Sequence, residues 1–292
     1  MTIRIRRATV EDYRGIEALL HDAYPAPLVG LLTERLQEKL QSNTCYSLVA
    51  VDESAIIGHA SIDNLDTSRV HFGSLAVSPK YRQKGIATAL TTAKIKHLEQ
   101  LRFQGIAVSE AVTHHPYSQQ SLLQAGFYPV RVLLGRHSHE QLEPYSSVGF
   151  VRLFQPPTEK TRLYLPEQYR GIASSVLAPI GTFAYRDSDS QETSKRIQEI
   201  HDEELCKPNA LLAVRLYEKT APAEIAYLQE RGFVIAGFYP VFIEENSRLS
   251  VVVHMHKVPS PLLDKTQIHV IPTVEQLFDF VWQQYEAQNV NK

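Results

Sequence analysis

A basic turn between a strand-like run and a helix-like run is the feature that most constrains this chain. The β-rich run Val70–Val77 leads into Arg82-Gln83-Lys84-Gly85, and Ile86–Leu101 then has apolar residues at helical spacing. The first amides of a helix have no partner inside the helix and lie at the positive end of its dipole. The glycine allows close approach of the backbone, and the arginine and lysine add positive charge. The turn therefore predicts a phosphate site; an ordinary basic turn is the alternative.

The elements around this turn predict an α+β fold, a sandwich of helices on a mixed sheet that is complete by about residue 150. Thr9 followed by Asp12 is typical of a helix start. Helical spacing reaches Ala23 and recurs from Leu31 to Leu40. The other expected elements are strands at Ile3–Ile5, Tyr46–Val51, Ala55–Asn64, Val70–Val77, Gly105–Thr113 and Tyr128–Leu134, and a helix at Ser118–Gln124.

A polar segment with paired prolines, Gln155–Lys160, is the best linker candidate in the chain of 292 residues. We therefore expect two domains, residues 1–150 and residues 151–292. The second half also reads as α+β. Its expected strands are Thr161–Leu165, Ala210–Tyr217, Phe238–Glu244 and Leu249–Val258, and its expected helices are Glu167–Leu177, Thr193–Glu204, Pro222–Arg231 and Val274–Gln288.

Two short stretches of the first half are echoed, in the same order, in the second half. Leu122–Pro129 resembles Tyr227–Phe233. Val77–Ala87 resembles Leu165–Ala173, and the second of these stretches is two residues shorter than the first. This pattern predicts a duplicated fold, with chance similarity as the alternative. In the shorter copy, the turn before the helix is too short to form the same phosphate cradle.

Composition excludes several classes of protein. Hydrophobic residues make up 43% and charged residues 21%, which is close to a globular average. Residues 1–150 carry 15 Lys and Arg against 14 Asp and Glu. Of the totals of 30 and 32, residues 151–292 therefore carry 15 Lys and Arg against 18 Asp and Glu. Neither half has the basic excess that nucleic acid or an anionic membrane favours. This charge balance predicts small-molecule or neutral partners. Two cysteines and the lack of an 18-residue apolar run predict a cytoplasmic protein.

The turn and its surroundings resemble the Arg/Gln-x-x-Gly-x-Gly/Ala motif of the GNAT superfamily of N-acetyltransferases. The resemblance covers roughly residues 3–135 and includes Ile5-Arg6-Arg7-Ala8-Thr9 with Asp12, Leu75–Ala87 and Gly126-Phe127. It implies a GNAT-like mixed sheet flanked by helices. The echoes then imply a tandem arrangement, in which the second half is a degenerate GNAT-like domain.

The resemblance also implies acetyl-CoA as co-substrate. In this family the pyrophosphate lies on the loop that matches Gln83–Thr88, and the pantetheine arm pairs with the strand end Leu75–Val77 where two parallel strands splay apart. An amide near Leu75 would polarise the acetyl carbonyl. The implied cofactor-binding residues are Leu75, Ala76, Val77, Arg82, Gln83, Lys84, Gly85, Ile86, Ala87, Thr88 and Ser118.

Acetyl transfer to an amine needs a base, because an aliphatic amine is mostly protonated at neutral pH. Where several family members have a glutamate, this chain has His71, whose usual pKa suits the role; a solvent-facing strand histidine is the alternative. Many family members have a tyrosine as general acid four residues before the Gly-Phe glycine, where this chain has Leu122. Tyr117 and His115 are the nearby substitutes. A thiolate is a tolerable leaving group, so this loss does not by itself abolish catalysis.

The acceptor site is the least defined part of this interpretation. Tyr24 and Tyr46 fall where GNAT folds admit the acceptor, and Glu110 on the cofactor strand could reach an amine. The histidine pairs have no carboxylate or cysteine at metal-ligand spacing, so we expect no metal. The sequence thus predicts an enzyme that acetylates a primary amine of a small molecule or a protein. A non-catalytic acyl-CoA sensor or interaction module is the alternative, and the oligomeric state is open.

Overall fold

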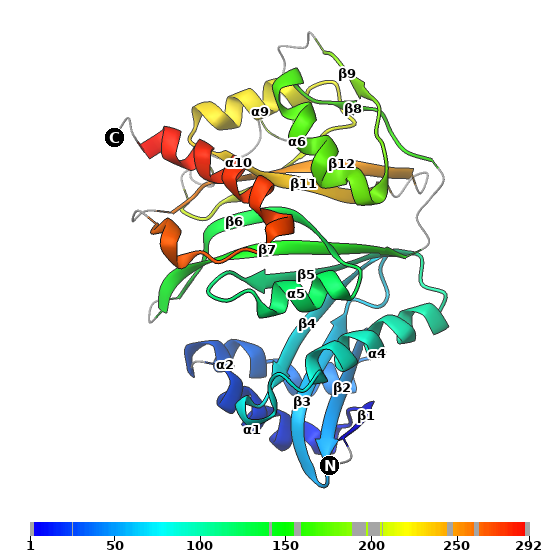
Figure 1. Cartoon of the computed structure of the whole chain (residues 1–292). Coiled ribbons are helices and arrows are strands. Elements are labelled where there is room, and N and C mark those ends of the chain that lie inside the picture. The colour runs from blue at the N-terminus through cyan, green and yellow to red at the C-terminus, as the bar shows by residue number, and fades with distance from the viewer. Residues whose placement is uncertain are drawn as a thin grey trace.

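A ten-stranded sheet runs through the whole chain in the computed structural model, which describes residues 3–24, 26–139, 142–154, 159–188, 197, 205, 207–243, 248–259 and 263–289. The strand order is β1-β2-β3-β4-β5-β7-β6-β11-β12-β10. In Figure 1 the first half lies in the lower part and the second half in the upper part, with β6 and β7 between them. The two halves are therefore joined edge to edge through β6 and β11.

The first half contains seven strands and five helices of four residues or more among its described residues. The strands are β1 (Ile3–Arg7), β2 (Cys45–Asp52), β3 (Ala55–Asp63), β4 (Arg69–Val77), β5 (Gly105–Val112), β6 (Tyr128–His139) and β7 (Leu142–Phe154). The helices are α1 (Tyr13–Ala23), α2 (Ala26–Thr33), α3 (Leu36–Gln41), α4 (Ile86–Gln100) and α5 (Tyr117–Gln124). Helices α1 and α3 pack on one face of β2–β4, and α4 packs on the other.

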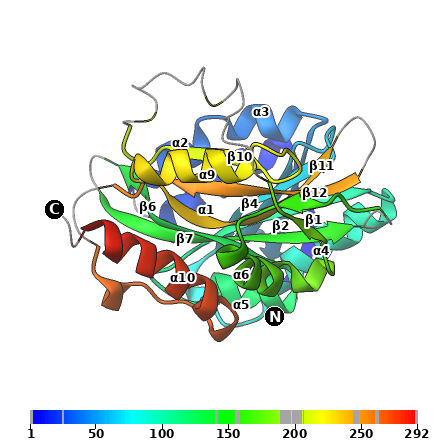
Figure 2. The ribbon, with the colours of Figure 1, turned by 90° about the horizontal axis from the view of Figure 1, so that it is seen from above.

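The second half has fewer long strands. They are β10 (Leu211–Arg215), β11 (Val234–Ile243) and β12 (Arg248–His256), beside a short parallel pair of β8 (Leu163–Tyr164) and β9 (Tyr185–Arg186). Among the described residues of this half, the helices are α6 (Glu167–Leu177), α9 (Ala221–Glu230) and α10 (Pro272–Asn289). Seen from above in Figure 2, α5, α6 and α10 lie on one side of the strands.

Most expected elements are present, with three differences. Strand β7 was not predicted; it pairs with both β5 and β6, and a domain boundary between residues 150 and 151 would fall inside it. The helical stretch predicted from Leu31 to Leu40 is two helices, α2 and α3, separated at Glu34-Arg35. The helix predicted at Thr193–Glu204 and most of the linker predicted at Gln155–Lys160 lie outside the described residues.

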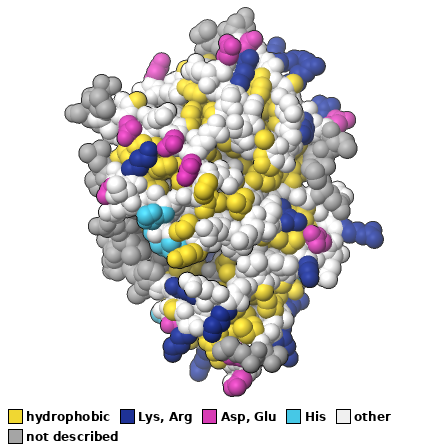
Figure 3. Space-filling model, in the orientation of Figure 1, with side chains coloured by type: hydrophobic (Ala, Val, Ile, Leu, Met, Phe, Trp, Pro, Cys, Tyr) yellow, Lys and Arg dark blue, Asp and Glu magenta, His cyan; other side chains and the backbone are white. Residues whose placement is uncertain are grey.

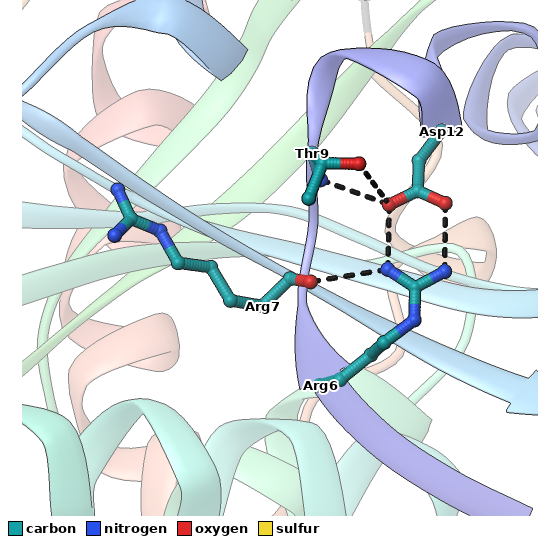
Figure 4. Close-up of polar contacts among 4 residues, drawn as sticks. All are labelled: Arg6, Arg7, Thr9 and Asp12. Carbon is teal, nitrogen blue, oxygen red and sulfur yellow. Dashed lines mark hydrogen bonds and ion pairs between the residues drawn. The ribbon is translucent and has the colours of Figure 1, made fainter.

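The predicted helix start at Thr9 is fixed by a carboxylate. Asp12 Oδ2 accepts the Thr9 amide at 2.8 Å, and both Asp12 oxygens accept the Arg6 guanidinium at 2.6 and 2.8 Å (Figure 4). The Arg6 hydrogen bonds hold the pKa of Asp12 below its usual value. The Thr9–Asp12 pattern therefore ties the first strand to the first helix through Arg6.

The first echo has the same local structure in both halves. Gly126 and Gly232 both have a left-handed φ, of 76° and 80°, directly after α5 and α9. The next residue, Phe127 or Phe233, donates its amide to the carbonyl of Leu122 or Leu228 at 3.0 or 3.1 Å. This is the hydrogen bond that closes a helix at a C-terminal glycine. The strand orders β5-β7-β6 and β10-β12-β11 match as well, in opposite directions along the sheet.

The second echo keeps one contact and loses the loop. Arg82 and Arg170 occupy equivalent positions, and each donates Nε to the carbonyl five residues before it, Val77 at 3.4 Å and Leu165 at 2.9 Å. Helix α4 begins after Gly85, whereas α6 begins directly after Pro166 and includes Gly171. In the second half, the residues that match the loop before α4 therefore form the first turn of helix α6.

One hydrophobic cluster connects the halves, from Ile62 to Tyr285. The segment before α10 also binds back to the first half, since the His269 amide donates to the Thr113 carbonyl at 2.7 Å. The buried side chain of Gln119 on α5 bonds both His269 O and the Ile271 amide. The second half is thus built into the fold of the first.

Candidate functional site

Strands β4 and β5 are parallel and separate part-way along their length. Their register pairs are Arg69 with Ile106, Val70 with Ala107 and His71 with Val108. Beyond this point, β4 continues beside β3 as far as Val77, and β5 continues beside β7. The splay that the resemblance implied is therefore present between the predicted strands.

A bulge in β4 lies at the mouth of this splay. The register with β3 shifts between His59 and Ser61, and Ser74 has a left-handed φ of 48°. A bulge leaves its extra residue outside the regular ladder, and Ser74 and Leu75 accordingly have no register partner in β3. The Tyr24 hydroxyl donates to the Leu75 carbonyl at 2.7 Å, and burial raises the pKa of Tyr24 to about 12. Tyr24 and Leu75, predicted separately, lie together.

The basic turn ends in a glycine that opens the helix. Gly85 is the N-cap of α4 with φ 76°, and no side chain caps this helix end. A Cβ added at Gly85 would meet no described atom within 4 Å. A groove of about 500 Å³ runs from Gly85 along small residues of the first turns of α4, lined by Gly85, Thr88, Ala89, Thr92, Ala93 and Lys96. The first amides of α4 are thus accessible to an anion.

The two cations of the turn lie at its sides. Arg82 donates to Val77 O and to Ala23 O, which holds it against the ends of β4 and α1. The Lys84 ammonium lies 4.9 Å from the centre of the Tyr81 ring. Both contribute positive charge near the loop without covering the glycine.

His71 is half-buried, opposite Asp63 in the β3–β4 register. Burial lowers the pKa of His71, and the negative charges of Asp63 and Glu110 oppose that change. Asp63 is itself held by Lys39 Nζ at 2.8 Å. His71 is therefore neutral at pH 7 and able to accept a proton, with two carboxylates near it.

Aromatic and histidine side chains gather at the end of β5. His114 and His115 are in contact, Tyr117 lies beside His115, and Tyr145 on β7 lies edge-on to His114, with centroids 6.2 Å apart. Burial lowers the pKa of His115, and the positive charge of Arg82 adds to this effect. Tyr117 is 64% exposed. Sequence reasoning missed Tyr145, because its strand was not predicted.

Two residues of α5 bear on the cofactor and acid assignments. Ser118 Oγ, in the first turn of α5, is buried and has no hydrogen-bond partner among the described residues. Leu122, at the position of the family tyrosine, is buried in the core. A buried leucine offers no proton, as expected from the sequence.

Two of the three residues predicted for the acceptor site, Glu110 and Tyr46, contact charged or aromatic side chains of other elements. Glu110 forms an ion pair with Arg131 on β6 and does not stand alone in the splay. Tyr46 is stacked on His97 of α4, with centroids 3.5 Å apart, so it lies on the face of the sheet opposite to α1. The alternation of side chains along β2 explains this placement, because Val49 faces α1 and Leu48 faces α4. Tyr24 and Tyr46, both predicted to lie at the acceptor site, are therefore on opposite faces of the sheet.

Lys94 on α4 is a buried lysine that the sequence analysis did not single out. Its side chain is nearly inaccessible, its ammonium lies 4.2 Å from the Phe72 ring centre, and it donates to Ser61 O at 3.4 Å. Burial lowers the pKa of Lys94 to about 7. Helical spacing puts Lys94 on the same face as Leu90 and Leu98, which was the available signal.

No group of three or more metal-ligating side chains occurs among the residues that the structure describes. In the same part of the chain, no helix is long and apolar enough to cross a membrane. The face in Figure 3 shows histidine side chains midway along the molecule, and Lys and Arg scattered among hydrophobic side chains on its lower part.

The family model "Acetyltransferase (GNAT) family" matches residues 13–127. This range contains the splay, the bulge and the Gly85 turn. Residues 13–127 form a GNAT acetyltransferase domain. Within this range, the predicted GNAT family, the mixed α+β sheet and an acetyltransferase domain are confirmed. No curated protein matches the chain.

Solved structures of this GNAT type match about half of the chain. They include the ribosomal-protein-S18-alanine N-acetyltransferase from Escherichia coli (12% identity, 54% of this chain and 97% of that chain, TM-score 0.47). Arabidopsis thaliana NAA60 with a bisubstrate analogue matches at 19% identity, 53% and 99% coverage, and TM-score 0.46. An N-acetyltransferase from Staphylococcus aureus Mu50 matches at 16% identity over 53% of this chain and 100% of that chain, with a TM-score of 0.46. Because these TM-scores are below 0.5, the assignment of residues 13–127 to the GNAT family rests on the family model alone.

Proposed function

We propose that this GNAT protein transfers an acetyl group directly from acetyl-CoA to a primary amine, with no acyl-enzyme. The observation that carries the proposal is the open Gly85 turn at the start of α4, beside the mouth of the β4–β5 splay. The loop from Gln83 to Thr88 would hold the pyrophosphate, and Leu75, Ala76 and Val77 would pair with the pantetheine arm. Ser118, with its buried hydroxyl, would contact the cofactor.

His71 would take the first proton. The acceptor arrives as an ammonium ion, His71 removes one proton, and the amine nitrogen forms a bond to the acetyl carbon. Backbone groups at the Leu75 bulge would stabilise the oxyanion. The carbon–sulfur bond then breaks, CoA leaves as the thiolate, and the remaining proton lost by nitrogen passes to the thiolate or to solvent. Tyr117 and His115 are the candidates to carry that proton.

For the second half we propose a degenerate GNAT-like domain. Three features support this: the matching helix ends at Gly126 and Gly232, the matching Arg82 and Arg170 contacts, and the strand orders on the two sides of β6 and β11. Because β7 extends to Phe154, we place the change from first to second domain after this strand. The cytoplasmic location stays a prediction; a buried free thiol at Cys45 is consistent with it.

A second candidate function is a non-catalytic acyl-CoA sensor, and the buried Leu122 in place of an acid favours it. Both functions need acetyl-CoA binding, so turnover distinguishes them. The test is thiol release from acetyl-CoA with a panel of aliphatic, aromatic and peptide N-terminal amines. We expect steady turnover with at least one amine. Tight acetyl-CoA binding without turnover across the panel would favour the sensor.

A further inference from the structure

A buried polar cluster joins the second half to the splay of the first. Its centre is Arg131 on β6, which is 8% exposed. Arg131 Nη2 bonds Glu110 Oε1 on β5, and Arg131 Nη1 lies 3.0 Å from His254 Nδ1 on β12. One arginine therefore links a carboxylate of the first half with an imidazole of the second.

The donor in the Arg131–His254 contact follows from chemistry. A guanidinium has donors and no acceptor, so His254 Nδ1 must accept with its lone pair. Burial, with the positive charges of Arg131 and Arg69, lowers the pKa of His254 well below its usual value. His254 is therefore neutral, and it fixes Arg131 without adding a second positive charge.

The space for Arg131 is made by close backbone approach. A Cβ at Gly149 would lie 2.6 Å from the Arg131 side chain, and a Cβ at Gly237 would lie 2.1 Å from Val130 O. The Tyr239 ring stacks on His254 with centroids 4.8 Å apart and has the Arg131 guanidinium 5.3 Å from its centre. Arg131 is thus held on several sides by groups of both halves.

The carboxylate at the end of this cluster acts on the site. Burial raises the pKa of Tyr145, and the charge of Glu110 adds to this effect; the same charge, after that of Asp63, opposes the lowering of the His71 pKa by burial. The Ser147 hydroxyl donates to Glu110 Oε2 at 3.4 Å. The side chain of Glu110 is 30% exposed, so the carboxylate is both held and accessible. A held, accessible carboxylate beside a neutral histidine suits an ammonium ion that is about to lose a proton.

We propose that His254 and Arg131 are positioning residues that hold the Glu110 carboxylate beside His71, where it binds the ammonium form of the acceptor. The acceptor site is then incomplete without the second half, and its substrates are cationic amines. This inference rests on the proposed acetyl transfer. A purely structural role of the ion pair is the competing explanation.

A double-mutant cycle tests the coupling, with His256 as a matched control. His256 lies two residues along β12, is buried, and contacts Leu134 O and Ala210 O. The probe is the fastest amine of the panel. Glu110→Gln should raise its KM roughly 10- to 100-fold, and His254→Leu roughly fivefold, with the acetyl-CoA KM within about twofold of the parent. His256→Leu should leave the amine KM unchanged.

The cycle gives opposite results for the two roles. If His254 acts through Glu110, the double variant matches Glu110→Gln within about twofold, and His254→Gln, which keeps an acceptor, recovers most of the affinity. If the two effects multiply, or if His256→Leu raises the amine KM equally, the positioning role is wrong.

A second measurement is independent of turnover. Proton NMR follows the titration of His71, assigned with His71→Gln, in the full chain without substrate. Groups that act on it are Asp63, Glu110, Lys94 and Lys39. Glu110→Gln should lower the His71 pKa, because a negative charge is removed, and His254→Leu should lower it less. An unchanged pKa in both variants would overturn the inference, whereas absent acetyl-CoA binding by the parent would overturn the proposed function.

Discussion

The two halves have the same helix ends and the same strand order, but they differ in the turn that precedes α4 in the first half and α6 in the second. In the first half, Gln83 and Gly85 take left-handed conformations and α4 begins after them. In the second half, α6 begins directly after Pro166, and its first residue is Glu167. A negative charge in the first turn of a helix disfavours the binding of a second anion there. The turn before α4 is thus two residues longer than the turn before α6 and has no acidic residue in the first turn of its helix.

The strand ends differ in the same way. Beside β5, the splay opens after the His71–Val108 pair. Beside β10, the Tyr164 amide donates to the carbonyl of Leu216, and the Thr161 amide donates to Leu249 O. In the second half these backbone bonds join the segment before α6 to the end of β10 and to β12. The comparison shows that the two halves share helix ends and a strand order but differ at the turn and at the strand ends.

The largest expected effect comes from the turn glycines. Gly85→Glu should abolish acetyl-CoA binding, since it puts a carboxylate and a side chain at a left-handed position in the cradle. Gly171→Glu is the matched control, because Gly171 is helical and a Cβ there meets no described atom within 4 Å. Thermal shift with acetyl-CoA measures both. Equal loss of the shift in the two variants would contradict the distinction between the halves.

The next largest effect concerns His71, the proposed base. His71→Gln should lower kcat/KM roughly 10²- to 10⁴-fold. In the parent, kcat/KM should fall as pH drops through the His71 pKa, which burial puts below 6.5, because the protonated ring cannot accept a proton. The variant should lose this limb of the pH profile. An unaltered rate and profile would remove His71 from the mechanism.

A smaller effect separates α4 from α6. Helix α4 buries Lys94, whereas the buried residues of α6 are Ala173, Val176 and Leu177. The Lys94 pKa is about 7 in the folded chain and near 10.4 unfolded, so the unfolded state binds more protons between these values. The free energy of unfolding should therefore rise with pH from about 7 to 10, by at most about 1.4 kcal/mol per pH unit.

Lys94→Met should raise the free energy of unfolding at pH 7 and flatten this rise. Urea unfolding at pH 7, 8 and 9 measures both changes. Lys96→Met, on the exposed side of α4, is the control and should keep the parental slope. The same slope in all three proteins would show that Lys94 is not the group responsible.

The smallest effect concerns the missing acid. Tyr117→Phe should lower kcat by about threefold or less, because the hydroxyl is largely exposed and a thiolate leaves without strong assistance. A comparison of kcat for natural acetyl-CoA in parent and variant is sufficient. A loss well above tenfold would make Tyr117 the general acid and weaken the sensor alternative further.

Local signals predicted much of the first half. The Thr9–Asp12 start, the Gly85 turn and the Gly126 helix end each depend on residues close in sequence, and each has the expected geometry. Strand β7 was not predicted because Pro144 and Gly149 interrupt its β-strand pattern in the sequence. Position 149 is a glycine because the Arg131 side chain packs against its backbone.

Long-range contacts could not be predicted in the same way. Arg131 and His254 are 123 residues apart, and their contact depends on the pairing of β6 with β11. The Tyr46 side chain illustrates a related limit, since its face of the sheet depends on the register of β2 and not on its neighbours in sequence.

The most direct test of the central claim is calorimetric titration of the full chain with acetyl-CoA. The account predicts one site per chain, lost in Gly85→Glu and kept in Gly171→Glu. Two sites per chain would show that the second half retains a working cradle. No binding would show that the GNAT fold is present here without its cofactor chemistry.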